Sequence, residues 1–403
     1  MKNDQNKIEK LISKLCPNGV AFKELGEIGG FYGGMSGKSK EDFSNGNAKY
    51  ITYMNIFSNI RVNTDIDTFV KVGKSENQNE IEYGDVLFTG SSETPDECGM
   101  SSVLTKKIDE PLYLNSFCFG FRLHDKELFL PEFLKYLFRD EQSRKQITQT
   151  ASGVTRFNVS KKRFAKIKIP LPPLAIQQEI VKILDIFTEL EAELEAELEA
   201  RKKQYEHYRS ELLTFGDGVE WTTLGEGCLS ITAGGDLPDN YLKGQNMSTK
   251  EFPYPIYSNG TDDKALYGYT DGYRIDNEAV TISARGTIGY HAVRRAKFTP
   301  IVRLIILIPN TKIVTSWFLN YILDITKIGH SGGSIPQLTV PNVKKIKIPV
   351  PSLAEQERIV SILDKFNALV NDISIGLPAE LKARRQQYEY YRGKLLTFKS
   401  LEL

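Results

Sequence analysis

Residues 166–187 read KIKIPLPPLAIQQEIVKILDIF, and residues 345–366 read KIKIPVPSLAEQERIVSILDKF. Fifteen of these 22 aligned positions are identical. The repeat continues further along the chain, where RKKQYEHYRSELLTF (201–215) matches RRQQYEYYRGKLLTF (384–398) at ten of 15 positions. An internal repeat of this length determines the architecture, so the rest of the sequence is interpreted around it.

Shorter matches extend the repeat to the parts of the chain before each long element. NGVAFKELGEI (18–28) resembles DGVEWTTLGEG (217–227), and SGVTRFNVS (152–160) aligns without gaps to SGGSIPQLT (331–339). Between these matched ends the two globular parts share little sequence. We therefore predict a duplicated frame with diverged content: a globular domain at 1–170, a helix at 171–215, a second globular domain at 216–349 and a final helix at 350–403.

The long elements have the periodicity of helices. In each, apolar residues recur at steps of three and four, which places them on one helical face. The first helix is predicted over 173–214 and would be about 60 Å long at ~1.5 Å per residue. Such a length without caps is typical of a coiled coil. Gly376 and Pro378 predict a kink or break in the second helix.

Because the two apolar stripes match, we expect the helices to pack against each other in antiparallel fashion. The globular parts read as mixed α/β or α+β domains with short strands, so the chain would be a pseudo-twofold internal repeat. Strands are expected at 50–56, 85–90 and 117–123, and at 254–260, 279–286 and 301–308. Helices are expected at 128–147 and 316–325.

The composition is that of an ordinary soluble globular protein, with 40% hydrophobic and 26% charged residues. No run of 18 apolar residues predicts a membrane helix, and the N-terminus lacks the features of a signal peptide. The four cysteines form no CxxC pair and are expected to be reduced thiols of a cytoplasmic protein.

The charges are segregated, although the net charge is only +1. The stretch 161–168 has five basic residues and no acid, whereas 189–199 has six glutamates and no base. Such blocks indicate separate surfaces with separate partners. Glutamates four residues apart repel one another mildly, so the acidic face favours a basic partner.

Motifs for catalysis are weak. YGGMSGKS (32–39) resembles a phosphate-binding loop, but Tyr32 stands where the first glycine is required. The four histidines show no metal-ligand spacing. Residue chemistry instead favours binding to nucleic acid, because lysine neutralises phosphate and arginine pairs with guanine. The candidate DNA-binding residues are Lys38, Lys40, Ser91, Arg156, Lys161, Lys162, Arg163, Tyr257, Asn259, Lys264, Arg285 and Gln337.

The order of these parts resembles the DNA specificity (S) subunit of type I restriction-modification systems. The residues that carry the resemblance are IPLPPLAIQQEIVKILDIF and IPVPSLAEQERIVSILDKF, followed by RKKQYEHYR and RRQQYEYYR. The LEAE tetrads at 190–197 look like the short repeats of the type IC-like subgroup. The resemblance implies a non-catalytic subunit without its own cofactor, which recognises two half-sites separated by unspecified base pairs.

The resemblance also implies partners. Two modification subunits would bind S-adenosylmethionine and methylate adenine at N6, and restriction subunits would hydrolyse ATP and cleave DNA. The expected partner-binding residues on the helices are Leu184, Phe187, Leu190, Leu194, Leu198, Tyr205, Leu363, Phe366, Leu369 and Tyr388. We further hypothesise that the helix length sets the gap, since one LEAE unit adds about 6 Å.

Two alternatives from other classes stay open at this point. A coiled-coil adaptor would join two protein partners and show no salt-dependent, sequence-dependent affinity for DNA. An enzyme with an unrecognised site in the globular parts would show turnover by this chain alone.

Overall fold

The structure is a computed structural model that describes residues 2–326, 328 and 337–401. The chain forms two compact units, and helix α7 (Leu174–Leu213) passes from one to the other. Unit 1 comprises Met1–Glu195 and Leu381–Leu403, and unit 2 comprises Ala196–Glu380. Residues 331–336, which form part of the second copy of the matched segment at 331–339, lie outside the described residues.

Unit 1 contains a four-stranded antiparallel sheet of β2 (Gly29–Gly33), β9 (Cys118–Leu123), β5 (Val86–Thr89) and β7 (Ser101–Val103), in that order. Three smaller sheets accompany it. They are β4 (Phe69–Val70), β3 (Ala48–Ile51) and β8 (Leu112–Leu114); β10 (Ala151–Ser152), β11 (Phe157–Val159) and β6 (Ser91–Ser92); and β1 (Ala21–Glu24) with β12 (Lys168–Leu171). The helices are α1 (Lys2–Leu15), α2 (Leu25–Ile28), α3 (Tyr53–Ser58), α4 (Pro131–Leu137), α5 (Glu141–Gln149), α6 (Lys161–Phe164), the first part of α7, and α12 (Leu377–Leu396) from Leu381 onward.

Unit 2 repeats this plan with a sheet of β14 (Cys228–Ala233), β21 (Ile305–Pro309), β18 (Ala279–Ile282) and β19 (His291–Arg294). Its other sheets are β15 (Tyr241–Lys243), β17 (Leu266–Thr270), β16 (Tyr254–Tyr257) and β20 (Thr299–Pro300), and β13 (Glu220–Thr223) with β22 (Lys347–Val350). Its helices are α8 (Leu224–Gly227), α9 (Ser316–Ile325), α10 (Val340–Lys344) and α11 (Leu353–Asn371). The prediction of a mixed helix and sheet fold in two repeated domains is confirmed.

The frame is repeated down to single hydrogen bonds. The fully buried Gln177 accepts from the Leu130 backbone N–H at 2.9 Å and donates to two carbonyl oxygens, those of Leu128 and Pro172. Its repeat partner Gln356 accepts from the Thr315 N–H at 2.9 Å and donates to two carbonyls in the same way. A buried amide is stable only when its polar atoms are paired. The same side chain therefore fixes each long helix to its own domain.

A second repeated contact joins each domain to its helix through a tyrosine. The Tyr136 hydroxyl donates to Asp185 at 2.6 Å, and the Tyr321 hydroxyl donates to Asp364 at 2.6 Å. In unit 1 the buried Lys135 also pairs with Asp185 at 2.6 Å, and burial lowers the pKa of that lysine. The frame is thus conserved between the halves, with small additions.

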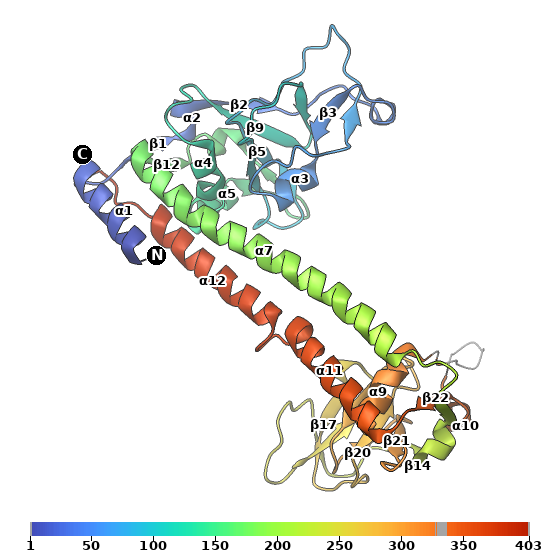
Figure 1. Ribbon diagram of the computed structural model, residues 1–403. Helices are drawn as coiled ribbons and strands as arrows, with labels where there is room; N and C mark the ends of the chain where they lie inside the picture. The colour runs from blue at the N-terminus through green and yellow to red at the C-terminus, as the bar shows by residue number, and fades with distance from the viewer. Residues whose placement is uncertain (1, 327, 329–336, 402–403) are drawn as a thin grey trace. The chain divides into compact units, whose positions relative to one another are not determined.

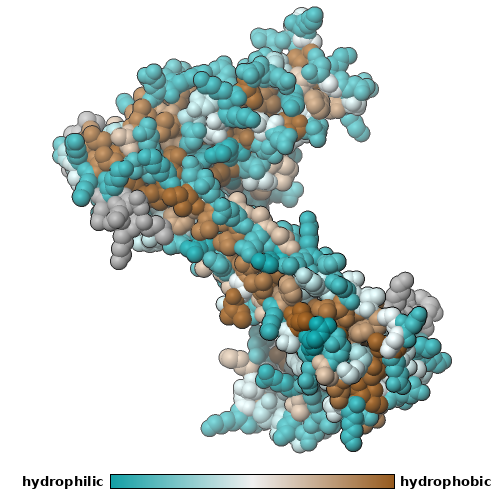
Figure 2. All heavy atoms as spheres, in the orientation of Figure 1, coloured by the Kyte–Doolittle hydropathy of each residue, from teal (hydrophilic) through white to brown (hydrophobic). Residues whose placement is uncertain are grey.

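The long helices pair in opposite directions within unit 1. Phe187 stacks on Tyr391 with 5.4 Å between ring centroids, and Arg385 bonds to Glu191 at 2.6 Å, so α12 runs against α7. In unit 2, α7 contacts α11 through Tyr208 and Phe366, whose ring centroids are 5.4 Å apart. On the face shown in Figure 2, hydrophobic side chains appear along the paired helices, and hydrophilic ones cover much of the rest.

Most expected helices are present, with one correction. The helix predicted over 128–147 is two helices, α4 and α5, because Asp140 caps α5 by accepting from the Gln142 N–H at 3.1 Å. The break predicted near Gly376 is confirmed, since α11 ends at Asn371 and α12 begins at Leu377. There the added Cβ of any other residue at Gly376 would lie 2.4 Å from the Ala368 carbonyl oxygen.

Several expected strands are shorter than their sequences suggested. The strands expected over 254–260 and 279–286 end at Tyr257 and Ile282. The strand expected over 50–56 ends at Ile51, because the Thr52 side chain accepts from the Asn55 N–H and begins α3. The strand expected over 301–308 begins only at Ile305. Before it, Val302 and Arg303 have positive φ values of 55° and 60°, which a strand does not allow. The four cysteines are free and buried.

Candidate nucleic-acid interface

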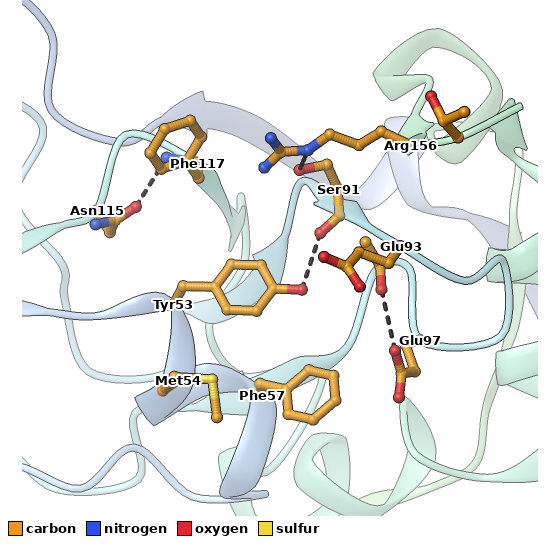
Figure 3. Close-up of a pocket in the computed structure, with 11 residues that line it drawn as sticks. Tyr53, Met54, Phe57, Ser91, Glu93, Glu97, Asn115, Phe117 and Arg156 are labelled. Carbon is orange, nitrogen blue, oxygen red and sulfur yellow. Dashed lines mark hydrogen bonds between the residues drawn. The ribbon is translucent and has the colours of Figure 1, made fainter. Parts of the chain in front are cut away.

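A hollow of about 510 Å³ lies in unit 1 where three loops meet helix α3 (Figure 3). Its apolar lining comes from α3 and from the turn before β9, and two of these side chains are unusually exposed, Met54 at 58% and Phe117 at 60%. Its polar lining comes from β6 and the segment that follows it, from the turn before β9, and from the segment that leads into β11. The lining residues are Tyr53, Met54, Phe57, Ser91, Ser92, Glu93, Glu97, Asn115, Phe117, Thr155 and Arg156.

Hydrogen bonds hold the floor and rim of this hollow in place. The Tyr53 hydroxyl donates to the Ser91 carbonyl at 2.9 Å, and burial raises the pKa of Tyr53, so the phenol stays protonated at neutral pH. The Asn115 carboxamide oxygen accepts from the Phe117 N–H at 2.9 Å. Gly90 donates its N–H to the Phe117 carbonyl at 2.8 Å, and a Cβ at that position would lie 2.6 Å from the same oxygen. The exposed Phe117 is therefore presented by a rigid turn.

The hollow brings together two of the residues that the sequence singled out, Ser91 and Arg156. The Arg156 Nε donates to the Ser91 hydroxyl oxygen at 3.2 Å, and the guanidinium carbon lies 5.7 Å from the Phe117 ring centroid. The acidic residue Glu97 is bonded locally, since it accepts from the Thr94 hydroxyl at 3.0 Å. No lining residue is a histidine, lysine or cysteine. This composition suits recognition of a polar, planar group better than acid–base catalysis.

The second domain gathers candidate residues at the corresponding place. The backbone bond from the Val159 N–H to the Gly90 carbonyl, at 3.0 Å, has its counterpart in the bond from Leu338 to Ala284, also at 3.0 Å. The residues that follow the two carbonyls are Ser91 and Arg285. Arg285 donates from Nη2 to the Gln337 side-chain oxygen at 3.1 Å. We call these places the strand junctions: residues 90–92 with 156–159 in unit 1, and 284–285 with 337–338 in unit 2.

Asn259 supports the second strand junction from a neighbouring loop. Its side-chain oxygen accepts from the Ala284 N–H, and its nitrogen donates to the Val302 carbonyl, both at 2.7 Å. The Arg294 guanidinium carbon lies 4.0 Å from the centroid of the Tyr257 ring, and the Tyr257 ring also packs on Phe298. Lys264 is exposed in the short helix Asp262–Ala265. Asn259 therefore shapes the loops, whereas Arg285 is the exposed charge that they present.

The remaining basic candidates in unit 1 are separate from the hollow. Lys38 is directed inward: its ammonium donates to the Lys71 carbonyl at 2.6 Å and pairs with Glu76, and its side chain is 6% exposed. Contact with a phosphate would require Lys38 to break these bonds. Lys40 is exposed.

Three further basic candidates lie together in helix α6. Lys161 lies 5.4 Å from the Phe119 ring centroid, and Lys162 is exposed. Arg163 donates to the Thr150 carbonyl at 2.8 Å. All three residues are exposed, so α6 presents a basic surface, although Arg163 is hydrogen-bonded to a backbone carbonyl.

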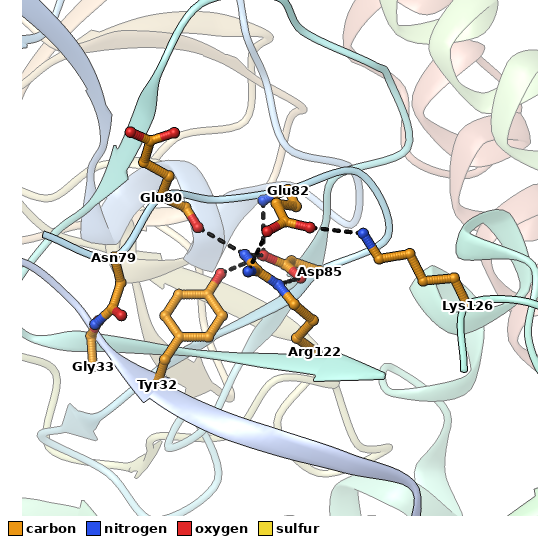
Figure 4. Close-up of polar contacts among 8 residues, drawn as sticks. All are labelled: Tyr32, Gly33, Asn79, Glu80, Glu82, Asp85, Arg122 and Lys126. Carbon is orange, nitrogen blue, oxygen red and sulfur yellow. Dashed lines mark hydrogen bonds and ion pairs between the residues drawn. The ribbon is translucent and has the colours of Figure 1, made fainter. Parts of the chain in front are cut away.

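Another polar cluster of unit 1 is structural (Figure 4). The buried carboxylate of Asp85 accepts from the Tyr32 hydroxyl at 2.6 Å and from Arg122 Nε at 2.8 Å. Burial and Asp85 raise the pKa of Tyr32, so it remains a donor. Glu82 pairs with both Arg122 and Lys126. Because its charges are matched internally, this cluster holds β2 and β9 against β5, and Tyr32 belongs to a strand and not to a phosphate loop.

The predicted partner-binding side chains on the helices pack mainly within the chain. Leu184 and Phe187 belong to the core of unit 1, and Tyr388 packs against it. Tyr205 and Leu363 belong to the core of unit 2, with Leu198 and Phe366 packed against it. Leu194 is buried, Leu190 is half-buried and Leu369 is 37% exposed. Any partner subunit would therefore meet mostly other faces of these helices.

Sequence reasoning missed the aromatic lining of the hollow. Tyr53 and Phe117 were assigned to expected strands, and nothing in the local pattern distinguishes an exposed Phe117 from a core residue. Glu93 was also missed, because one more exposed glutamate carries no signal until its neighbours in space are known. Among the described residues, no helix is long and apolar enough to span a membrane, and no cluster of potential ligands could hold a metal.

A duplicated frame that carries two similar domains, each with its own exposed arginine junction, defines a class of protein with two repeated domains. Comparison with known proteins identifies the family. The family model described as "Type I restriction modification DNA specificity domain" matches residues 17–200 and 240–383. The chain therefore belongs to the family of type I restriction-modification DNA specificity subunits, whose role is recognition of a DNA target.

Relatives in sequence agree with this assignment. A Mycoplasma pneumoniae protein named as a type I specificity subunit is 34% identical over 333 residues, which cover 79% of this chain and 90% of that protein. The specificity subunit of the Escherichia coli type I restriction enzyme EcoR124I/EcoR124II is 37% identical over 261 residues, 58% of this chain and 63% of that protein. The resemblance to type I specificity subunits is thereby confirmed, and the assignment to a type IC-like subgroup stays a prediction.

Solved structures show the same fold. A chain from a study of complex assembly in the type I restriction-modification system has a TM-score of 0.61 at 20% identity, covering 94% of this chain and 97% of its own. The HsdS subunit from Thermoanaerobacter tengcongensis has a TM-score of 0.53 at 20% identity, covering 95% and 97%. The fold prediction made from the repeat is therefore confirmed.

Proposed function

We propose that this chain is the non-catalytic subunit that recognises a bipartite, gapped double-stranded DNA target for a type I methyltransferase and endonuclease. The domains at 1–170 and 216–349 each read one half-site, and the helices at 171–215 and 350–403 carry the partner-binding surfaces. The partners are two modification subunits, which bind S-adenosylmethionine and methylate adenine at N6, and restriction subunits, which hydrolyse ATP. This assembly acts on DNA in the cytoplasm.

One observation supports this proposal above the others. The hydrogen bonds of the frame are the same in both halves, through Gln177 and Gln356, whereas the exposed residues of the strand junctions differ. A common frame suits two copies of the same partner. Different exposed side chains suit two different half-sites, because base edges are distinguished by the side chains that reach them.

The lack of a catalytic role is also part of the proposal. The hollow of unit 1 offers an arginine, two carboxylates and aromatic rings. The Ser92 hydroxyl donates to Glu97 at 3.3 Å, but the lining contains no histidine, lysine or cysteine that could activate that hydroxyl or act as a nucleophile itself. The modification subunit must take the target adenine out of the stack to reach its N6. This chain then needs only to position that subunit on the DNA.

The experiment that tests the proposal is a map of methylated bases in cells that express this chain with its modification subunit. Cells with the modification subunit alone are the control. A two-part, gapped N6-methyladenine motif that appears only with this chain is expected. A stable complex without new methylation would contradict the proposal and favour a structural adaptor.

A further inference from the structure

An arginine and a glutamate lie just beyond the paired strands of the strand junction of unit 1, one on each strand's side, and they form no ion pair. Strands β11 and β6 are antiparallel, with Phe157 opposite Ser92 and Asn158 opposite Ser91. One step further along this register places Arg156 opposite Glu93. Residues directly opposite in such a pair have Cβ atoms about 5 Å apart. Both side chains are exposed and line the same hollow, yet neither takes part in an ion pair in the described part of the chain.

The arginine is oriented before any ligand arrives. Its Nε donates to the Ser91 hydroxyl at 3.2 Å, and its guanidinium lies 5.7 Å from the Phe117 ring centroid. Ser91 is itself fixed, because the Tyr53 hydroxyl donates to its carbonyl at 2.9 Å. With Nε occupied, the two terminal nitrogens remain as a planar pair of donors on a side chain that lines the hollow. Such a fork matches two acceptors in one plane, as on the major-groove edge of guanine.

The glutamate adds an acceptor beside these donors. Glu93 is exposed and has no hydrogen-bonding partner among the described residues, in contrast to Glu97, which is held by Thr94. A free carboxylate next to an arginine weakens the attraction of the site for a phosphate, because two negative groups would be brought together. The edge of a G·C pair instead presents acceptors, O6 and N7 of guanine, next to a donor, N4 of cytosine.

We propose that Arg156 and Glu93 together read one G·C base pair in the half-site of the first domain. Arg156 donates to guanine O6 and N7, and Glu93 accepts from cytosine N4. Phe117 and Ser91 are positioning residues that hold the guanidinium in the plane of the base. The inference rests on the proposed function, and it specifies the chemistry of the base pair that this site takes.

The test is to map methylated motifs for the full chain with its modification subunit, in the wild type and in the variants Arg156→Ala, Arg156→Lys and Glu93→Gln. We expect the wild-type half-site of the first domain to contain a G·C pair at which Arg156→Ala lowers discrimination about 10- to 100-fold. Arg156→Lys should lose a similar factor, since lysine is a point charge without the fork. Glu93→Gln should raise the use of A·T at the same position, because glutamine pairs with adenine.

A matched control and the failing outcomes separate this inference from the proposed function. Arg61→Ala removes another exposed arginine of unit 1 that does not line the hollow, and it should leave the motif unchanged. A uniform loss of methylation at all sites in Arg156→Ala, or a half-site without a sensitive G·C pair, would overturn the inference while the gapped motif stands. Absence of any motif in the wild type would instead overturn the proposed function, and the inference with it.

Discussion

At the strand junction of unit 1 the exposed arginine belongs to the segment that leads into β11, whereas in unit 2 it belongs to the loop after β18. Arg156 reaches across to Ser91, and Arg285 reaches across to Gln337. The backbone bond beneath them, between Val159 and Gly90 or between Leu338 and Ala284, is the same. The strand junction thus lies at the same position in both domains. The exposed arginine, however, comes from one of the two joined segments in unit 1 and from the other in unit 2.

The contrast with the frame shows where a duplicated protein can diverge. Gln177 and Gln356 are fully buried, and each loss of a partner there would leave unpaired polar groups in the core. Exposed residues at the junctions form few contacts, so their replacement costs little stability. Recognition can therefore change from one half to the other while the attachment of each domain to its helix stays fixed.

The largest effect is expected from shortening the helix that both units share. Deleting residues 194–197 removes one LEAE unit, about 6 Å of helix, which is comparable to one or two base pairs at ~3.4 Å each. The sequence left behind, LEAELEAR, still offers Arg385 a glutamate at both of its contact positions. We expect the variant to methylate a motif with a shorter gap, unchanged half-sites and essentially no activity at the original sites.

The measurement is again a map of methylated motifs. Substituting Glu193 and Glu197 by glutamine changes the composition of the same tetrads without changing their length, and it should keep the original gap. An unchanged gap in the deletion variant would show that helix length does not set the spacing. Altered half-sites would show that the deletion disturbs the recognition domains themselves.

A smaller effect, on stability, should be the same in both halves. Gln177→Ala leaves one buried N–H and two carbonyls without their partner, and Gln356→Ala does the same in unit 2. We expect each to lower the free energy of unfolding of its own unit by about 3 kcal/mol. Both tryptophans, Trp221 and Trp317, lie in unit 2, so urea unfolding followed by fluorescence reports that unit.

Hydrogen exchange of the amides of α4 reports the loss in unit 1. The exposed neighbours Gln178 and Glu357 provide matched alanine controls, for which a change below ~0.5 kcal/mol is expected. If Gln177→Ala were as stable as Gln178→Ala, the duplicated contact would not be what holds helix and domain together.

The next effect distinguishes the halves at the level of sequence recognition. Arg285→Ala should relax one base position in the half-site of the second domain by about 1–3 kcal/mol of discrimination. The half-site of the first domain should not change, because Arg285 belongs to unit 2. Methylation kinetics on oligonucleotides that vary one position at a time measure this. Equal relaxation at both half-sites would mean that Arg285 acts on the complex as a whole.

The frame was predictable from the sequence because the same helical pattern of apolar residues occurs twice in the chain. The helix expected over 173–214 is Leu174–Leu213, and the break near Gly376 lies where it was expected. Local hydrogen bonds that compete with periodicity were not predictable in the same way. The caps at Thr52 and Asp140 end one expected strand and divide one expected helix. Short polar side chains decide such boundaries, and apolar spacing does not report them.

The candidate site was predictable only in part. Ser91 and Arg156 were recognised by residue chemistry, and the structure brings them together although 65 positions separate them. The rest of the hollow depends on pairing between β6 and β11, whose register, continued by one step, brings Glu93 opposite Arg156. Lys38 shows the reverse, since a basic residue in a glycine-rich segment proves to be bonded inward to Glu76. Residue type suggests candidates, and only the fold determines which of them are free.

The smallest expected effect concerns a contact that one half has and the other lacks. In unit 1, Arg385 on α12 bonds to Glu191 on α7 at 2.6 Å and also pairs with Glu195. Its repeat partner Lys202 pairs instead with Glu199 of its own helix at 3.3 Å. Exposed ion pairs contribute little and are screened by salt. Arg385→Ala should therefore lower the stability of unit 1 by less than ~1 kcal/mol, and the difference should vanish in 1 M salt.

Lys202→Ala is the matched control for that variant, because it removes the corresponding cation from the first copy of the motif without breaking a contact between helices. Hydrogen exchange of the α12 amides at low and high salt measures the effect. A loss well above 1 kcal/mol that persisted in high salt would mean that the pair acts by fixing the register of α12 on α7, and not by the attraction of screened charges. In that case the acidic tetrads would serve the fold of unit 1 as well as the length of the helix.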